Sequence, residues 1–235
     1  MAEEVNEETN NELEEYYGTL ENNCHSIYDG NIGGEEVRMI FTRTDDMLSA
    51  AYITRADEEK FFDAKLGKNS FVLNGEGDDL LEGGVVTDEQ GFLTLKGEGM
   101  ISGKAVEFTL MPNTYFQIGG DIDDYYSAAK RRTAKEAEEF AMQIKADVDD
   151  KESFIKLIEY PVQVNFRGEL IFAENEVEMY DLYDKLMAYD GFHAKVKNMF
   201  TKYLFENYQG VCAENGIIWY EMNSDGNYKI IAFNA

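Results

Sequence analysis

Cysteine and proline are scarce in this sequence, which contains two of each in 235 residues. Cys24 and Cys212 fall one in each half of the chain, which is too few cysteines for a disulfide framework and gives no zinc spacing. Long apolar runs are also missing: no stretch reaches the roughly 18 residues of a membrane-spanning helix, and no secretory apolar segment follows Met1. We therefore expect unpaired cysteines and no transmembrane segment.

Positively charged residues are also scarce. The chain has 21 Lys and Arg residues against 47 Asp and Glu residues, which gives a formal net charge of -26 at pH 7. A surface this negative repels phosphate backbones and anionic lipid headgroups, so nucleic acid and bare membrane are excluded as expected partners. The charge favours solubility or a basic partner.

Residues 1–15 concentrate this acidity, with seven Glu and no Lys or Arg. Such a composition predicts a disordered, solvated tail. The tail resembles the spacer that follows the cleaved signal of a bacterial surface lipoprotein, which would place the protein outside the cytoplasm. A cytoplasmic protein with an acidic N-terminus explains the same residues, and both explanations stay open.

Glycine divides the rest of the chain. Fifteen of the 20 glycines precede residue 121, whereas the long segments of helical periodicity, 125–142 and 175–188, follow it. With 44% hydrophobic and 13% aromatic residues, each half can build a core. We expect two domains, a β-barrel domain at 16–118 and an α+β domain at 119–235.

The first half shows short apolar or alternating runs separated by hairpin-turn residues. About eight antiparallel strands at this spacing predict a meander that closes into an up-and-down barrel. The expected strands are 16–20, 37–41, 47–54, 61–66, 70–76, 83–87, 92–98 and 106–111.

The second half mixes helices and strands. An apolar stripe predicts a helix from Tyr125 to Val148, and Asn175 with Glu178 three residues later forms a variant of the capping box. Pro161 ends helical structure. The expected helices are 125–148, 151–158 (capped by Asp149 or Asp150) and one that begins at 175, with a helical turn within 193–203. The expected strands are 162–166, 169–172, 210–222 and 228–234, of which the last two are long.

Two glycine pairs and an acidic cluster resemble ligand-binding loops. Gly75-Glu-Gly77 and Gly97-Glu-Gly99 begin like dinucleotide fingerprints but lack the third glycine and a following helix, so bulges or strand ends explain them better. Asp147, Asp149 and Asp150 begin like a calcium loop without its later ligands, and helix capping explains them better. No metal and no cofactor is expected.

Few residues are candidates for chemistry. His193, with Asp190 three residues earlier, is a candidate catalytic base with a carboxylate orienter, and a surface or capping role is the alternative. Aromatic residues on the elements that would surround a cavity are ligand-binding candidates, with core packing as the alternative. These are Tyr160, Tyr183, Tyr203, Trp219 and Tyr220.

The second half is similar to a known superfamily over about residues 122–235. Its markers are Glu159–Val162 (EYPV), Leu204–Asn207 (LFEN), Asn215–Tyr220 (NGIIWY) and Lys229–Asn234 (KIIAFN), in the order helix, helix, strand, hairpin, capped helix and strands. They resemble the bacterial branch of the nuclear transport factor 2-like superfamily.

That resemblance implies a curved antiparallel sheet wrapped around helices as a cone with a cavity. Members include ketosteroid isomerases, SnoaL-like cyclases and dehydratases, and binding modules without a known reaction. The enzymes hold an Asp or an Asp/His pair inside the cone, facing a Tyr or another donor, and no such pair is evident at a matching position here. The open sheet face often dimerises, which implies a homodimer.

The first half resembles lipocalin-like meander barrels of bacterial surface proteins. The markers are Tyr17-Gly18-Thr19 and the repeated units Leu73-Asn74-Gly75, Leu80-Leu81-Glu82 and Leu95-Lys96-Gly97, although Ser49–Tyr52 departs from the pattern. The resemblance implies an interior that holds either a packed core or a small apolar ligand.

Two hypotheses about function follow. In the first, the protein is a non-catalytic binding protein, outside the cytoplasm of a bacterium, for a small apolar ligand or a protein partner. In the second, the cone is an isomerase, dehydratase or cyclase that acts on an apolar carbonyl compound, with His193 or an Asp as base and Tyr160 or Tyr183 as donor.

Overall fold

The computed structural model describes residues 20, 23–44, 47–67, 70–87, 93–117 and 134–235. The chain forms two compact units. The first consists of Met1–Thr54 and Glu58–Ile122, and the second of Arg55–Asp57 and Asp123–Ala235. The expected acidic tail and all but Leu20 of the expected strand 16–20 lie outside the described residues.

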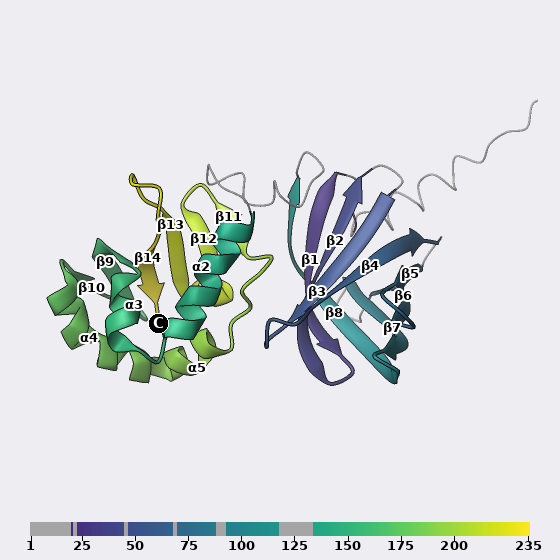
Figure 1. Cartoon of the computed structure of the whole chain (residues 1–235), viewed down its shortest axis with the longest axis horizontal. Coiled ribbons are helices and arrows are strands. Elements are labelled where there is room, and N and C mark those ends of the chain that lie inside the picture. The colour runs from purple at the N-terminus through teal and green to yellow at the C-terminus, as the bar shows by residue number, and fades with distance from the viewer. Residues whose placement is uncertain (1–19, 21–22, 45–46, 68–69, 88–92, 118–133) are drawn as a thin grey trace, which may run out of the picture. The chain divides into compact units, whose positions relative to one another are not determined.

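The first unit is a closed barrel of eight antiparallel strands, as expected (Figure 1). Each strand pairs with the next one along the chain, and the last pairs with the first. The barrel is therefore a meander without free edges. Its strands are β1 (Cys24–Ile32), β2 (Glu35–Thr44), β3 (Met47–Thr54), β4 (Glu59–Leu66), β5 (Phe71–Asn74), β6 (Leu80–Thr87), β7 (Leu93–Ile101) and β8 (Lys104–Gln117).

The strand that sequence analysis missed is β1. Its sequence, CHSIYDGNI, places buried residues next to one another from Cys24 to Tyr28, so it lacks the alternation that marks a half-buried strand. The end of β8 was also missed because it contains Pro112. The proline lies opposite Tyr28, beside a register shift between Ile27 and Tyr28, where a missing N–H is tolerated.

A chain of aromatic rings fills the barrel interior. The ring centroids of Tyr28 and Phe41 are 5.5 Å apart, those of Phe41 and Phe71 5.7 Å, and those of Phe71 and Phe108 6.0 Å. All four residues are at most 3% exposed. Rings at these separations attract one another, so they form a packed core that runs across the barrel.

The glycines of Gly97-Glu98-Gly99 are neither a bulge nor a strand end, contrary to our expectation. They lie in a regular part of β7, paired with Gly83 and Leu81. A Cβ at Gly97 would lie 2.0 Å from the carbonyl oxygen of Glu82 and 2.7 Å from the Phe108 ring. Glycine is thus needed here because strand β6 and a core ring approach the backbone closely.

The second unit contains a six-stranded sheet in the order β10-β9-β14-β13-β12-β11. The sheet is mixed, which corrects the expectation of a wholly antiparallel one, because β14 runs parallel to β9. The strands are β9 (Ile158–Phe166), β10 (Glu169–Ala173), β11 (Phe205–Asn207), β12 (Gly210–Ala213), β13 (Ile218–Met222) and β14 (Tyr228–Asn234).

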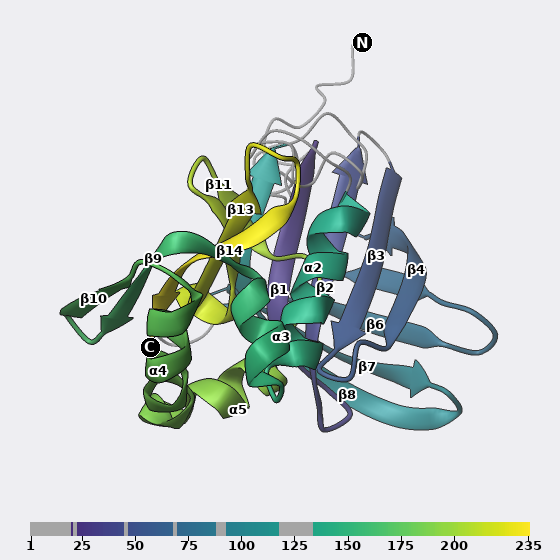
Figure 2. The same ribbon diagram turned by 60° about the vertical axis from the view of Figure 1, so that its left-hand side comes forward.

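Helices of this unit pack against one face of the sheet (Figure 2). The Phe233 ring of β14 lies 6.0 Å from Phe154 of α3 and 5.9 Å from Phe192 of α5, and Phe140 of α2 lies 5.2 Å from Tyr220 of β13. These ring contacts form the core of the unit. The described helices are α2 (Ala134–Asp147), α3 (Lys151–Lys156), α4 (Glu176–Ala188) and α5 (Phe192–Lys197), with short 3-10 helices at Tyr189–Gly191 and Glu214–Gly216.

The expected single strand at 210–222 is wrong. Strands β12 and β13 pair with each other, joined by a turn in which Glu214, Asn215 and Gly216 all have positive φ angles. The apolar residues on both sides of this turn read as one continuous strand in the sequence. The short strand β11, which pairs with β12, was not expected.

The cap predicted at Asn175 is confirmed, and of the two alternatives given for α3, Asp149 and Asp150, the cap is Asp150. The Asp150 side chain accepts hydrogen bonds from the backbone N–H groups of Glu152 and Ser153 and begins α3. The Asn175 side chain accepts from Val177 and Glu178 and begins α4, while the Glu178 carboxylate accepts from the backbone N–H of Glu174. Residues 125–133 of the first expected helix lie outside the described part of the chain.

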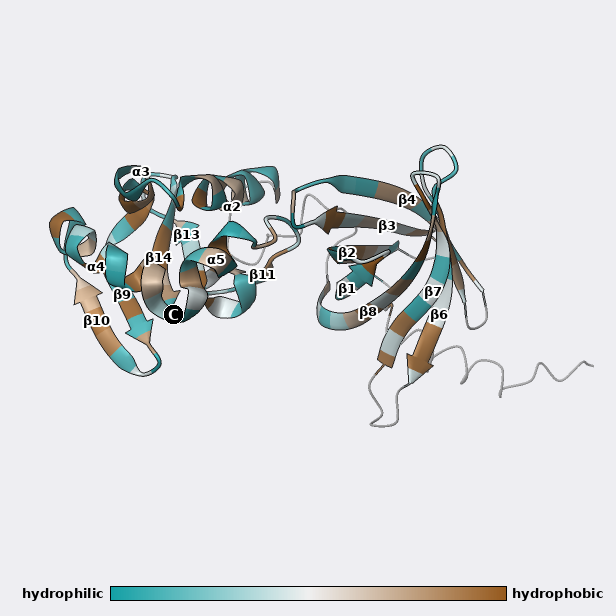
Figure 3. Ribbon diagram, turned by 90° about the horizontal axis from the view of Figure 1, so that it is seen from below, coloured by the Kyte–Doolittle hydropathy of each residue, from teal (hydrophilic) through white to brown (hydrophobic). Residues whose placement is uncertain are grey.

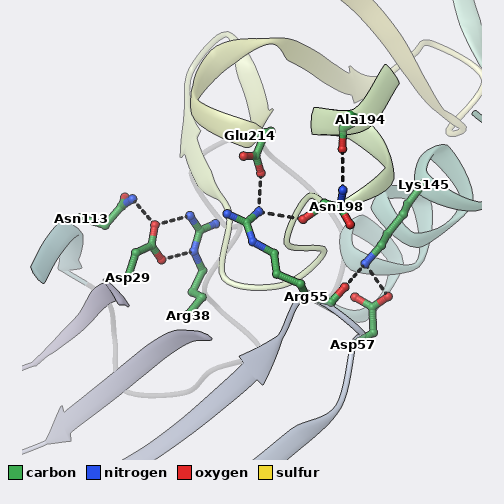
Figure 4. A network of polar contacts seen from close by, with 9 residues as sticks. All are labelled: Asp29, Arg38, Arg55, Asp57, Asn113, Lys145, Ala194, Asn198 and Glu214. Atoms are coloured by element: carbon green, nitrogen blue, oxygen red, sulfur yellow. Dashed lines mark hydrogen bonds and ion pairs between the residues drawn. The ribbon is translucent and has the colours of Figure 1, made fainter. Parts of the chain in front are cut away.

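Ion pairs support each unit separately (Figure 4). In the barrel, Arg38 donates two hydrogen bonds to Asp29, at 2.7 and 2.8 Å. In the second unit, Lys145 of α2 donates to Asp57 at 2.9 Å. Such charge-assisted hydrogen bonds are stronger than neutral ones.

Candidate interaction surface

The hydroxyl groups of three predicted ligand-binding tyrosines are bound to the protein's own backbone. Tyr160 donates to the carbonyl of Ile155 at 3.1 Å, Tyr183 to that of Val148 at 2.5 Å, and Tyr220 to that of Ala137 at 2.9 Å. Burial is the main cause that raises the pKa of each phenol. These hydroxyls stay protonated and hold helical segments in place.

Tyr203 is also a core residue, with 4% of its surface exposed. Its backbone N–H donates to the carboxylate of Glu138 at 3.1 Å, and its φ angle is 53°. The backbone here takes the left-handed conformation that non-glycine residues seldom adopt. Tyr203 therefore contributes packing and a backbone contact to the interior of the unit.

His193 and Asp190 take different partners. The Nε2 atom of His193 lies 2.7 Å from Asp149, whose carboxylate also accepts a hydrogen bond from Lys197. The hydrogen bond from Lys197, followed by that from His193, holds the pKa of Asp149 below its usual value. The structure thus joins His193 to a carboxylate that precedes α3 in the sequence.

Asp190 forms two ion pairs at the protein surface. It accepts a hydrogen bond from Arg167 at 2.6 Å and one from Lys195 at 3.3 Å, and the Arg167 contact is the main cause that lowers its pKa. Its φ of 43° is again left-handed. Each of the two aspartates near α5 is thus neutralised by nearby cations at the surface.

Two buried carboxylates of this unit, Glu138 and Glu206, are not among the candidates predicted from the sequence, and they are 8% and 3% exposed. Their charges raise the pKa of Tyr220 further. A signal for Glu138 was present, because it is three residues before Ala141 and so lies on the apolar stripe of its helix. Glu206 was harder to find because β11 was not recognised as a strand.

Trp219 differs from the other aromatic candidates because it lies on the sheet face away from the helices. Cross-strand pairing places it between Ala232 of β14 and Cys212 of β12. These residues belong to a row of side chains that lie opposite one another on neighbouring strands. The row continues through Gln163 to Phe172 on one side and to Phe205 on the other. We call two rows of residues the open sheet face. The first is the row just described, Phe172, Gln163, Ala232, Trp219, Cys212 and Phe205, and the second is the neighbouring row of Leu170, Asn165 and Asn234.

The nine residues named above are uncharged, although 29% of the residues in the chain are charged. Charge begins one row further along β13, at Glu221, which lies opposite Lys229. Phe172 is 56% exposed, Leu170 54% and Phe205 37%. The Phe205 and Trp219 rings meet edge to face, with centroids 6.3 Å apart. In Figure 3, β10 is coloured largely on the hydrophobic side of the scale. An uncharged surface rich in aromatic residues is typical of an interface core.

These features define a two-unit protein with a closed β-barrel and a second unit in which helices pack on a mixed sheet. No family model, curated protein or solved structure matches the chain. Along the described ranges, no helix has the length and apolar composition needed to cross a membrane.

Proposed function

We propose that this is a non-catalytic interaction protein whose second unit binds a second copy of the chain through the open sheet face. One observation carries the proposal: the row from Phe172 to Phe205 crosses all six strands without a charged residue. Binding energy in interfaces concentrates in buried aromatic anchors, and Trp219 lies within this row.

A surface role is favoured over a ligand inside the barrel because the barrel interior is occupied by rings. The chain of contacts from Tyr28 through Phe71 to Phe108 takes up the space that an apolar ligand would use. We propose, from the order of its helices and strands, that the second unit is a cone of the nuclear transport factor 2-like kind. The acidic composition of residues 1–15 supports an extracytoplasmic location in a bacterium.

A reaction in the second unit receives less support. It requires a tyrosine hydroxyl that is available to a substrate, and the hydroxyls of Tyr160, Tyr183 and Tyr220 donate to backbone carbonyls. His193, the expected base, is 42% exposed in its side chain and bound to Asp149. The geometry therefore favours binding over catalysis.

A second copy suits the open sheet face because the contact would bring together two uncharged surfaces. The charge of -26 on each chain opposes association at longer range, so salt that screens this repulsion strengthens the dimer. This salt response separates an apolar contact from one made by ion pairs, which salt weakens.

Sedimentation velocity of the full chain at micromolar concentration tests the proposal. We expect a dimer for the wild type and a monomer for Phe172→Asp, because the introduced charge would lose its water in the interface. Val177→Asp is the matched control, since Val177 is 72% exposed on α4, outside the open sheet face. A monomeric wild type in high salt, or equal effects of the two substitutions, would contradict the proposal.

A further inference from the structure

A groove of about 810 Å³ lies on the outer surface of the barrel, over β6, β7 and β8 and the turn after β1. We call it the acidic groove. The backbone N–H of Gly33 in that turn donates to the carbonyl of Glu107 at 2.9 Å and holds the turn against β8. The side chains that line the groove across the three strands are Glu82, Glu98, Glu107, Leu80, Met100 and Ala105.

The strand register arranges these side chains in two parallel rows. Glu98 pairs with Glu82 on one side and with Glu107 on the other, so three carboxylates lie directly opposite one another. Met100 pairs in the same way with Leu80 and Ala105, which forms an apolar row beside the acidic one. Rows two residues apart are separated by about 7 Å along a strand.

Like charges directly opposite each other on a sheet destabilise it. Elsewhere in this barrel, the opposed charges are complementary, as in the pair of Asp29 and Arg38. Among the residues that the structure describes, Glu82, Glu98 and Glu107 form no ion pair. Side chains that destabilise the fold locally, as this row of carboxylates does, are found at the functional sites of proteins.

The carboxylates are spread along a row rather than gathered around one point. In the described ranges, no three His, Cys, Asp or Glu side chains lie close enough together to hold a metal ion. The groove therefore matches an extended partner with several positive charges.

We propose that the acidic groove binds a basic amphipathic helix of a protein partner. Its Lys or Arg side chains face Glu82, Glu98 and Glu107, and its aliphatic side chains face Leu80 and Met100. Neighbouring strands are about 4.8 Å apart and successive helical turns about 5.4 Å apart, so a helix laid across the strands presents one basic residue per carboxylate. The inference concerns a different unit and surface from the open sheet face, and it stands independently of it.

A labelled synthetic peptide of about four helical turns, with lysines at positions i, i+4 and i+7 and leucines on the adjacent face, tests this proposal. Its binding to the full chain is measured by fluorescence anisotropy in low salt. We expect Glu98→Gln to weaken binding about threefold, which is typical of one exposed ion pair, and the triple change of Glu82, Glu98 and Glu107 to Gln to weaken it more than tenfold.

Asp225→Asn is the matched control because it removes one negative charge from an exposed turn of the other unit. Circular dichroism checks that every variant is folded. Equal weakening by Glu98→Gln and Asp225→Asn would overturn the proposal, since the peptide would then respond to net charge alone. Equal binding of a peptide with the same composition in scrambled order would overturn it as well.

Discussion

The acidic groove and the open sheet face are both surfaces built from rows of side chains across neighbouring strands. The groove places three carboxylates in one row, whereas the open sheet face places aromatic and small uncharged residues in a row that crosses six strands. In each case, cross-strand register converts residues that are distant in sequence into one continuous surface.

The difference between the two surfaces lies in the forces that they offer a partner. Charge attraction at an exposed groove is long-ranged and screened by salt. Burial of apolar surface acts only at contact and does not depend on charge. The same chain thus has one surface suited to a basic partner and another suited to an uncharged one, and each predicts a separate response to mutation and salt.

The largest effect is expected for Trp219→Asp. This change removes the aromatic anchor from the open sheet face and introduces a charge, so we expect self-association to weaken by about 30-fold or more, or about 2 kcal/mol. Sedimentation measures the change. Peptide binding to the acidic groove is expected to stay the same, and loss of both activities would show that the two surfaces are not independent.

Asp79 provides a paired acid to compare with the unpaired row. Its carboxylate accepts hydrogen bonds from Lys60 at 2.6 Å and from the backbone of Ser102 at 2.5 Å. The hydrogen bond from Lys60 is the main cause that lowers the pKa of Asp79. Because two charge-assisted contacts are lost, we expect Asp79→Asn to reduce the free energy of unfolding by about 2 kcal/mol at pH 7.

The pH dependence of this effect follows from the direction of the shift. A carboxyl whose pKa is lower in the folded state stabilises the fold above its unfolded value of about 3.9, and this contribution is lost as the pH falls through the folded pKa. Urea unfolding at several pH values should therefore show wild type and Asp79→Asn converging in acid. A constant difference down to the lowest pH would contradict the assigned ion pair.

Salt should separate the two surfaces in a single experiment. When the NaCl concentration rises from about 50 to 500 mM, the Debye length falls from more than 10 Å to about 4 Å. We expect peptide binding to the groove to weaken about tenfold, by 1.4 kcal/mol, while self-association strengthens. Fluorescence anisotropy measures peptide binding, and sedimentation measures self-association. If salt changed both in the same direction, the two surfaces would not differ in the way proposed.

Local signals in the sequence predicted local structure well. The bounds of β3 and the caps formed by Asp150 and Asn175 depend on residues close together in the chain. The bounds of β3 and the Asn175 cap were predicted correctly, and Asp150 was one of two alternatives for the other cap. The parallel pairing of β9 with β14 was not, because it joins segments about seventy residues apart with no local signature. β1 was missed since its buried residues do not alternate.

The candidate surfaces were harder to predict than the fold. Trp219 was singled out as an aromatic residue, but its position on the open sheet face depends on which residues lie opposite it. Likewise, Glu82, Glu98 and Glu107 are unremarkable acidic residues in an acidic sequence. Only the register of β6, β7 and β8 brings them into one row, and a shift of one residue would turn Glu98 into the barrel.

The smallest expected effect measures how much the row of three carboxylates destabilises the fold. Because Glu98 is opposed by a like charge on both sides, we expect Glu98→Gln to raise the free energy of unfolding by about 0.5 kcal/mol, measured by urea unfolding in low salt. The gain should vanish in high salt, where the repulsion is screened. Asp225→Asn, at an exposed turn, should change stability less. A destabilised Glu98→Gln variant would mean that the row is already stabilised within the folded chain, and the groove would then lose its argument for a basic partner.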